Sequence, residues 1–179
     1  VYGNGFRGVI DANFLDAYGL RAELLFGALP GFDYWFVDGA ATFTPSIPLA
    51  GIFGLNAFGG GAYYNMRPGS EHSFESIGDI SRRASYIPEE NGWGFKVMTG
   101  ISTTDGSLLT GRAALEASFA GTGSLQSITL DGDFSMLSAS SLETGGVDML
   151  RLVGTVDYNH SGRTLSAELG YDVNVPTVS

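Results

Sequence analysis

The sequence predicts an all-β protein, and three observations support this. Apolar and polar residues alternate with period two along most of the chain, as in strands with one apolar face. Connections such as LDAYG (15–19), AGTGS (120–124) and NHSGR (159–163) are too short for a parallel crossover, so neighbouring strands must be antiparallel. No stretch keeps a 3.6-residue period over three turns. We therefore expect about nine antiparallel strands in a curved sheet, a sandwich or a barrel.

The first three expected strands, 6–14, 18–26 and 34–43, show the alternation most clearly. Polar residues such as Arg7, Glu23 and Asp38 fall between their apolar residues. The apolar sets are Phe6, Gly8, Ile10, Ala12 and Phe14, then Leu20, Ala22, Leu24 and Phe26, then Trp35, Val37, Gly39, Ala41 and Phe43.

The later strands repeat the alternation of apolar and polar residues. In one of them, Leu109, Leu115 and Phe119 alternate with Arg112 and Glu116. Glycine and alanine fill the positions between the large apolar residues, so large and small side chains alternate on the apolar face. The remaining strands are expected at 51–65, 93–101, 107–119, 124–136, 148–158 and 164–175.

One segment, 66–92, breaks the alternation and is expected to form a long loop. Its sequence, MRPGSEHSFESIGDISRRASYIPEENG, is polar and has no clear period. Loops of this length are uncommon in compact domains and often carry function. We interpret this one as a contact surface rather than an active site. Its candidate contact residues are His72, Glu75, Arg82, Arg83, Glu89 and Glu90.

The stretch AFGGGAYYNM (57–66) has the glycines of a phosphate-binding loop but lacks its context. No helix follows it, and the only lysine of the chain is Lys96, so neither a dinucleotide fingerprint nor a P-loop is present. Glycine in a strand indicates close approach by a neighbouring backbone or a bulky side chain. We interpret the stretch as a close-packing strand, with Gly59, Gly60, Gly61, Tyr63 and Tyr64 as its key residues.

Composition excludes several classes of function. Nineteen acidic and nine basic residues give a net charge of −10, so nucleic acid is not an expected partner. The chain has no cysteine, and no G-x-S-x-G motif occurs. Asp131 and Asp133 share a strand face, and His160 lies in a turn; solvated surface positions explain all three. No catalytic, cofactor-binding or metal-binding residue is therefore predicted, and the chain is not expected to be an enzyme.

We expect residues 1–179 to form a single glycine-rich domain that belongs to a larger protein. Both ends of the chain look cut. A short internal repeat links GVIDANF (8–14) to GTVDYNH (154–160), and each opens a hairpin whose second arm contains Ala-Glu-Leu. Repetition of a hairpin suggests a sheet that grows by adding similar units.

The stretches GFRGVIDANFL, YWFVDGAATF and IPLAGIFGLNAFGGGAYYNM resemble segments of very large, repetitive, β-rich envelope and surface proteins of the Bacteroidetes type. The resemblance covers about a third of the chain and carries no catalytic motif. It implies an extracellular or bacterial cell-envelope location. The expected partners are other segments of the same large protein or neighbouring copies.

These observations predict a non-catalytic structural or binding module of a secreted or cell-surface protein. It would act through sheet packing, strand-edge assembly and the 66–92 loop. An outer-membrane β-barrel is the alternative, because the ends of many strands are aromatic, as in membrane girdles. Odd strand number and irregular loop lengths count against that alternative. A trough that binds lipid or another hydrophobic ligand is the second alternative. The aromatic strand ends are Phe6, Phe14, Trp35, Phe43, Trp93, Phe119, Tyr158 and Tyr171.

Overall fold

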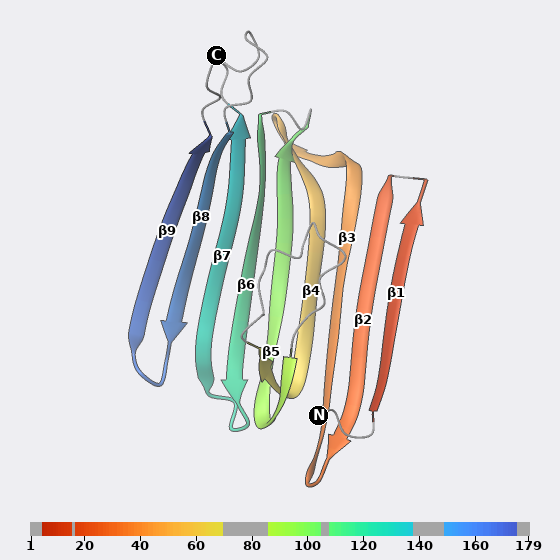
Figure 1. Cartoon of the computed structure of the whole chain (residues 1–179), viewed down its shortest axis with the longest axis vertical. Helices are drawn as coiled ribbons and strands as arrows, with labels where there is room; N and C mark the ends of the chain where they lie inside the picture. The colour runs from red at the N-terminus through yellow and green to blue at the C-terminus, as the bar shows by residue number, and fades with distance from the viewer. Residues whose placement is uncertain (1–4, 16, 70–85, 105–107, 138–148, 175–179) are drawn as a thin grey trace.

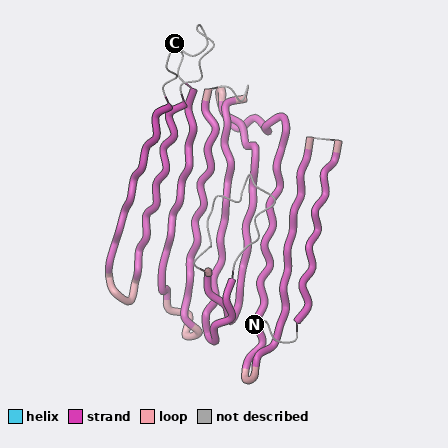
Figure 2. Tube along the Cα trace, viewed as in Figure 1, coloured by secondary structure: helices cyan, strands magenta, loops and turns pink. Residues whose placement is uncertain are grey.

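The computed structural model describes residues 5–15, 17–69, 86–104, 108–137 and 149–174, and nine strands account for most of them. The strands alternate in direction, and the described connections between them are short turns (Figure 2). Their bounds are β1 Gly5–Phe14, β2 Tyr18–Leu29, β3 Phe32–Ala50, β4 Phe53–Pro68, β5 Tyr86–Thr103, β6 Leu109–Ala120, β7 Leu125–Leu137, β8 Met149–Asn159 and β9 Thr164–Asn174.

All nine strands form one sheet in which the spatial order equals the chain order (Figure 1). Every neighbouring pair is antiparallel, from β1 with β2 to β8 with β9. The sheet is open, so β1 and β9 are its two edges. The prediction of an all-β chain with nine antiparallel strands is confirmed. Of the three predicted arrangements, the curved single sheet is the one formed.

Strand positions agree with the alternation pattern to within a few residues, except that β3, expected to end at 43, continues to Ala50, and except beside the predicted loop. There, β4 continues to Pro68 and β5 begins at Tyr86, so both strands extend into the segment expected to be a loop. The residues at the two ends of the predicted loop are instead paired with each other: Met66 with Pro88, Arg67 with Ile87 and Pro68 with Tyr86. We call this paired end of the β4–β5 hairpin, residues 66–68 and 86–88, the folded tip.

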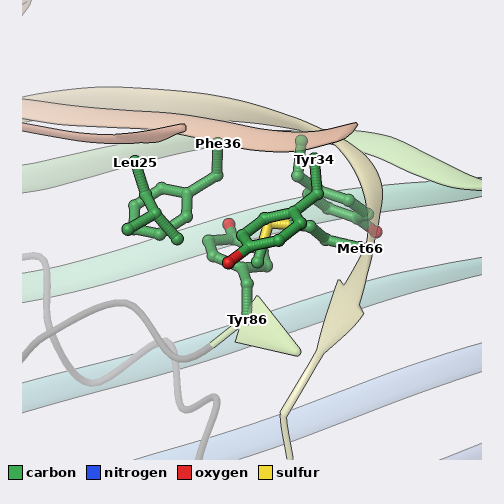
Figure 3. Packing of buried hydrophobic residues seen from close by; sticks show 6 residues of the cluster. Leu25, Tyr34, Phe36, Met66 and Tyr86 are labelled. Atoms are coloured by element: carbon green, nitrogen blue, oxygen red, sulfur yellow. The ribbon is translucent and has the colours of Figure 1, made fainter. Parts of the chain in front are cut away.

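The main cluster of buried apolar side chains lies where the folded tip meets the sheet. Met66 and Tyr86 of the tip pack with Tyr34, Phe36 and Tyr63, and Leu25 completes the cluster (Figure 3). A second, smaller cluster consists of Ala57, Met98 and Ala114 in the middle of the sheet. The core is therefore one-sided: both clusters lie on the same face, as their cross-strand register shows.

Candidate functional site: a charged face, an apolar face and a folded tip

The two faces of the sheet differ in charge. Residues directly opposite each other on neighbouring strands share a face, and successive residues on one strand alternate between faces. By this rule the strand positions that have a cross-strand partner, outside the folded tip and the turn-proximal Asp33, carry all their charged side chains on one face, which we call the charged face. These residues are Arg7, Asp11, Arg21, Glu23, Asp38, Lys96, Arg112, Glu116, Asp131, Asp133, Arg151, Asp157, Glu168 and Asp172.

One transverse row of the charged face holds most of its buried charge. The row crosses all nine strands as Val9, Glu23, Asp38, Gly61, Lys96, Glu116, Thr129, Asp157 and Ser166. We call it the charge row. Glu23, Lys96 and Glu116 are each about 5% exposed, so these ionisable groups sit almost out of solvent. Such burial is tolerated when each charge has a partner.

The partners of the charge row come from within the sheet. Lys96 forms an ion pair with Asp38, two strands away, and Glu23 pairs with Arg7 on β1. Arg21 adds a second, longer contact of 3.8 Å to Glu23. Two of the three buried charges of the row, Glu23 and Lys96, are therefore held in ion pairs.

Gly61 makes the contact between Lys96 and Asp38 possible. It lies directly between them in the register, opposite Asp38 on one side and Lys96 on the other. A Cβ at this position would lie 2.9 Å from the carbonyl oxygen of Val37 and 3.1 Å from Oδ1 of Asp38. The missing side chain leaves the space through which the ammonium reaches the carboxylate.

Two asparagines create the bend that folds the tip over the charged face. Asn65 and Asn91 both have positive φ angles, 51° and 67°, a conformation that asparagine accepts more readily than most residues. The backbone N–H of Asn91 donates to Oδ1 of Asn65 at 2.9 Å, and Nδ2 of Asn65 donates to the carbonyl of Asp33 at 2.7 Å. The register of β4 with β5 shifts at this point, between Tyr64 and Met66.

Tyr86 anchors the folded tip. Its ring lies 4.9 Å from the rings of both Phe36 and Tyr63, centroid to centroid, and Nζ of Lys96 lies 5.7 Å from its centroid. The side chain is 2% exposed. Burial, followed by the nearby carboxylates of Asp38 and Glu116, raises the pKa of Tyr86 well above its ordinary value, so the phenol stays neutral.

Next to the tip, the charged face is hollowed over β6, β7 and β8. The hollow has a volume of about 470 Å³, and Pro68 and Gly69 close one side of it. Asp133 lies between two arginines, with Arg151 at 2.8 Å and Arg112 at 3.4 Å. The hollow is also lined by four residues with hydroxyl groups: Ser118, Ser127, Thr129 and Thr155. The hollow is thus lined by a mixture of charged, hydroxyl and apolar groups, the last including Pro68, Ala114 and Val153.

The opposite face, which we call the apolar face, carries two rows of aromatic residues. One row crosses six strands without a break: Phe6, Phe26, Trp35, Tyr64, Trp93 and Phe119. The other row consists of Phe14, Tyr18 and Phe43 on β1, β2 and β3. Eight residues separate the rows on each of these three strands, which corresponds to about 26 Å at 3.3 Å per residue.

Between these rows the apolar face is made mostly of aliphatic side chains and glycine, with Phe58, Phe95 and Thr99 among them. Its middle row runs Ile10, Ala22, Gly39, Gly60, Val97, Leu115, Leu130, Val156 and Ala167. The large members of this face are exposed: Ile10 at 58%, Val97 at 47% and Leu130 at 45%. Monomeric soluble proteins rarely expose so large a contiguous apolar surface.

The predicted close-packing residues divide between the two faces. Gly59, Gly61 and Tyr63 lie on the charged face, and Gly60 and Tyr64 on the apolar face. A Cβ at Gly59 would lie 2.8 Å from the terminal methyl of Met98. The ring of Tyr63 covers Gly94 on the next strand, where a Cβ would collide with it. Tyr64 stacks with Trp35 at 6.4 Å in the aromatic row.

Of the predicted contact residues, four lie outside the described part of the chain: His72, Glu75, Arg82 and Arg83. Glu89 and Glu90 lie on β5 beside the folded tip and are exposed. Glu89 forms an ion pair of 2.7 Å with Arg67 across the hairpin. Within the described residues these two are surface positions near the tip and do not meet a common site.

Sequence reasoning missed the charge row and the two hinge asparagines. The alternation pattern could have indicated the row, because alternation places the charged residues of each strand on one face. Aligning them into a row also requires the register between strands. The register depends on turn lengths and bulges that the pattern does not give. Asn65 and Asn91 had the weaker signal of asparagines flanking a segment without alternation.

Comparisons with protein-family models, curated proteins and solved structures found no match to this chain. In the described ranges, no group of three or more histidine, cysteine or carboxylate side chains is placed to hold a metal ion. The same residues contain no helix long and apolar enough to cross a membrane.

Proposed function

We propose that the nine strands form part of a membrane-embedded wall of bacterial outer-membrane type, with the apolar face toward lipid and the charged face toward water. This was the alternative that the sequence predicted, and one observation now favours it. Between the aromatic rows, the apolar face carries no charged side chain in its paired positions, while the opposite face carries all fourteen.

The dimensions of the apolar face support the same proposal. Outer-membrane strands present an apolar band about 25 Å tall with aromatic residues at both borders. The aromatic rows of β1, β2 and β3 are about 26 Å apart along the strands, which corresponds to about 18–21 Å of this height at the usual strand tilt of about 35–45°. Nine residues, Phe6 to Phe14, span the distance on β1, which is the length a tilted strand needs to cross a bilayer.

The position of the hollow argues against a lipid-binding trough. The 470 Å³ hollow is lined by both apolar residues, such as Ala114 and Val153, and charged residues, such as Asp133, and the charged groups are unfavourable for a purely apolar ligand. Gly59 and Gly61, which would have formed the floor, lie on the charged face beside Lys96 and Met98. The role of this face is to contact water and the folded tip.

A structural module of a secreted or surface protein is the second candidate, and the alternation of large and small residues on the apolar face favours it. Phe6, Gly8, Ile10, Ala12 and Phe14 could interdigitate with a second sheet. In that case another sheet, rather than lipid, would cover the apolar face. The two candidates share a non-catalytic role and differ in what covers this face.

Vesicle flotation with two matched variants tests the proposal. Ala167 and Ser166 are neighbours on β9, both exposed, on the apolar and the charged face respectively. An arginine on a lipid-facing strand position near the bilayer centre costs about 2–4 kcal/mol. We expect Ala167→Arg to reduce vesicle-bound protein at least tenfold and Ser166→Arg to leave it unchanged.

Two results would contradict a lipid-facing role. One is a wild-type chain that is monodisperse in detergent-free buffer and remains at the bottom of the flotation gradient. The other is an equal loss of vesicle binding in Ala167→Arg and Ser166→Arg. Binding of the apolar face to a protein sheet in detergent-free buffer would support the second candidate.

A further inference from the structure

The two edges of the sheet cannot satisfy each other in an antiparallel pair. Because neighbouring strands alternate in direction and there are nine of them, β1 and β9 run the same way (Figure 1). An antiparallel partner for β9 must therefore be a separate strand. This holds whether the apolar face contacts lipid or protein.

The β9 edge lacks most of the features that normally prevent pairing. Natural edge strands are protected by charged side chains, especially lysine, and by proline, bulges or short length. From Thr164 to Asn174, β9 carries two acidic residues, Glu168 and Asp172, but no proline, lysine or arginine, and its eleven residues pair with β8 without a register shift. The side chains from Thr164 to Val173 are exposed. Such a strand has the properties of one that is paired on both sides.

The β8–β9 hairpin has the same register as the β1–β2 hairpin. Gly8 faces Leu24 and Gly154 faces Leu169, at equivalent places in the repeat LRAELLFG (20–27) and LSAELGYD (165–172). By the same equivalence, Ala22 of β2 corresponds to Ala167 of β9. The second edge of β2 is occupied by β3, with Gly39 opposite Ala22.

We propose that the free edge of β9 binds an antiparallel strand in the position that β3 takes on β2. The bound strand has alternating apolar residues that continue the apolar face. A small residue lies opposite Ala167, as Gly39 does opposite Ala22, and an aromatic residue lies opposite Tyr171, as Trp35 does opposite Phe26. Main-chain hydrogen bonds supply affinity, and the alternating side chains set the register.

Charge defines one further position of the bound strand. Glu168 corresponds to Glu23, which is neutralised by Arg7 and Arg21. The positions equivalent to these arginines are Val153 and Ser166, so the hairpin does not supply the same cations. An acidic residue directly opposite Glu168 would be repelled. The bound strand therefore carries lysine or arginine opposite Glu168, where β3 has Asp38.

Two matched peptides test this inference against the whole chain in detergent micelles. Both contain residues 32–43 flanked by two lysines at each end, and one carries Asp38→Lys. In a cross-strand pair, like charges are unfavourable and opposite charges favourable by up to about 1 kcal/mol, or fivefold in affinity. We expect the Asp38→Lys peptide to bind three- to fivefold more tightly, and Glu168→Gln in the protein to abolish this preference.

Cysteine crosslinking tests the register in the same samples, because the chain has no cysteine of its own. We expect Ala167→Cys in the protein to form a disulfide with Gly39→Cys in the peptide in higher yield than with Val37→Cys or Ala41→Cys. Directly opposite positions bring Cβ atoms close enough for this bond. Ile10→Cys on β1 and a peptide of scrambled sequence are the controls.

Equal crosslinking at Ile10→Cys, or a yield no higher than with the scrambled peptide, would overturn the inference. Indifference to the residue at position 38 would reject the predicted cation. Peptide pairing is measured in micelles and needs no insertion into a bilayer. Failure of this inference is thus distinguishable from failure in the flotation experiment.

Discussion

On the charged face Lys96 is 5% exposed, whereas on the apolar face Phe58 is 57% exposed. A soluble sheet protein places its apolar face inside and its charges in water. Here the tightest packing surrounds ionisable groups, and the aliphatic and aromatic side chains of the other face have no cover among the described residues. The difference shows that burial in this sheet is concentrated on the charged face, and it is the main support for the proposal that the apolar face contacts lipid.

The packing of the charged face depends on specific side-chain pairs rather than on the amount of apolar surface that is buried. The folded tip supplies Met66 and Tyr86 to its apolar cluster, and cross-strand ion pairs hold Lys96 and Glu23 of the charge row. The apolar face needs no comparable pairs, because apolar contact is non-directional. Substitutions on the charged face should therefore have effects that depend strongly on the partner, and this can be tested in detergent micelles, which cover the apolar face.

The largest loss of stability is expected from Lys96→Met. It keeps an unbranched side chain of nearly the same length but removes the ion-pair partner of Asp38, in a row that also holds Glu23 and Glu116. Breaking one partner of a buried ion pair costs about 3–5 kcal/mol. The measurement is the free energy of unfolding by urea in micelles.

The control for Lys96→Met is the double variant with Asp38→Asn. Removing both charges also removes the uncompensated buried carboxylate, so we expect it to recover more than half of the lost stability. If the double variant were as unstable as the sum of the two single variants, the ion pair would not be the source of the effect.

A somewhat smaller loss is expected from Tyr86→Ala, because this ring holds the folded tip against Phe36 and Tyr63. Truncating a buried aromatic residue costs about 3 kcal/mol. We also expect faster proteolysis within the tip. Ile87→Ala, at the next position and 39% exposed, is the matched control and should change both quantities little. Equal proteolysis of the two variants would show that Tyr86 is not the anchor.

A loss of about 1–3 kcal/mol is expected from Gly61→Ala, the cost of inserting atoms into a packed site. The added methyl would approach Oδ1 of Asp38 and the Val37 carbonyl at about 3 Å. Gly170→Ala is the control, because its nearest neighbour would be 3.9 Å away and alanine is otherwise the better strand residue. Unfolding by urea measures both. A stabilised Gly61→Ala would show that the space between Lys96 and Asp38 is not required.

The strands and their order could be predicted from the sequence because each depends on local information. Alternation marks a strand, and turns such as NHSGR (159–163) allow only an antiparallel neighbour. The aromatic residues at the strand ends could be read in the same way. Their alignment into a six-strand row needed the register, which the sequence pattern leaves open by one or more residues.

The folded tip could not be predicted because its residues form paired strand although their apolar and polar residues do not alternate. Its residues 66–68 and 86–88 pair with each other without alternation, since Met66 and Tyr86 turn toward the charged face after the bends at Asn65 and Asn91. The ion pair of Lys96 was hidden for a related reason. Its partner Asp38 lies 58 positions earlier in the chain and two strands away, across a glycine that carries no charge.

The smallest effect is expected from Glu89→Gln, on the exposed side of the folded tip. Glu89 and Arg67 are both about half exposed, and their 2.7 Å ion pair has water around it. Exposed pairs contribute about 0.2–1 kcal/mol and are screened by salt. We expect a loss below about 0.5 kcal/mol that disappears in 1 M salt, whereas the loss from Lys96→Met should persist there. The urea midpoint at low and high salt gives both values. Similar salt dependence for the two variants would mean that the Lys96–Asp38 pair is as accessible to solvent as the Arg67–Glu89 pair. The contrast between a buried and an exposed ion pair would then be wrong.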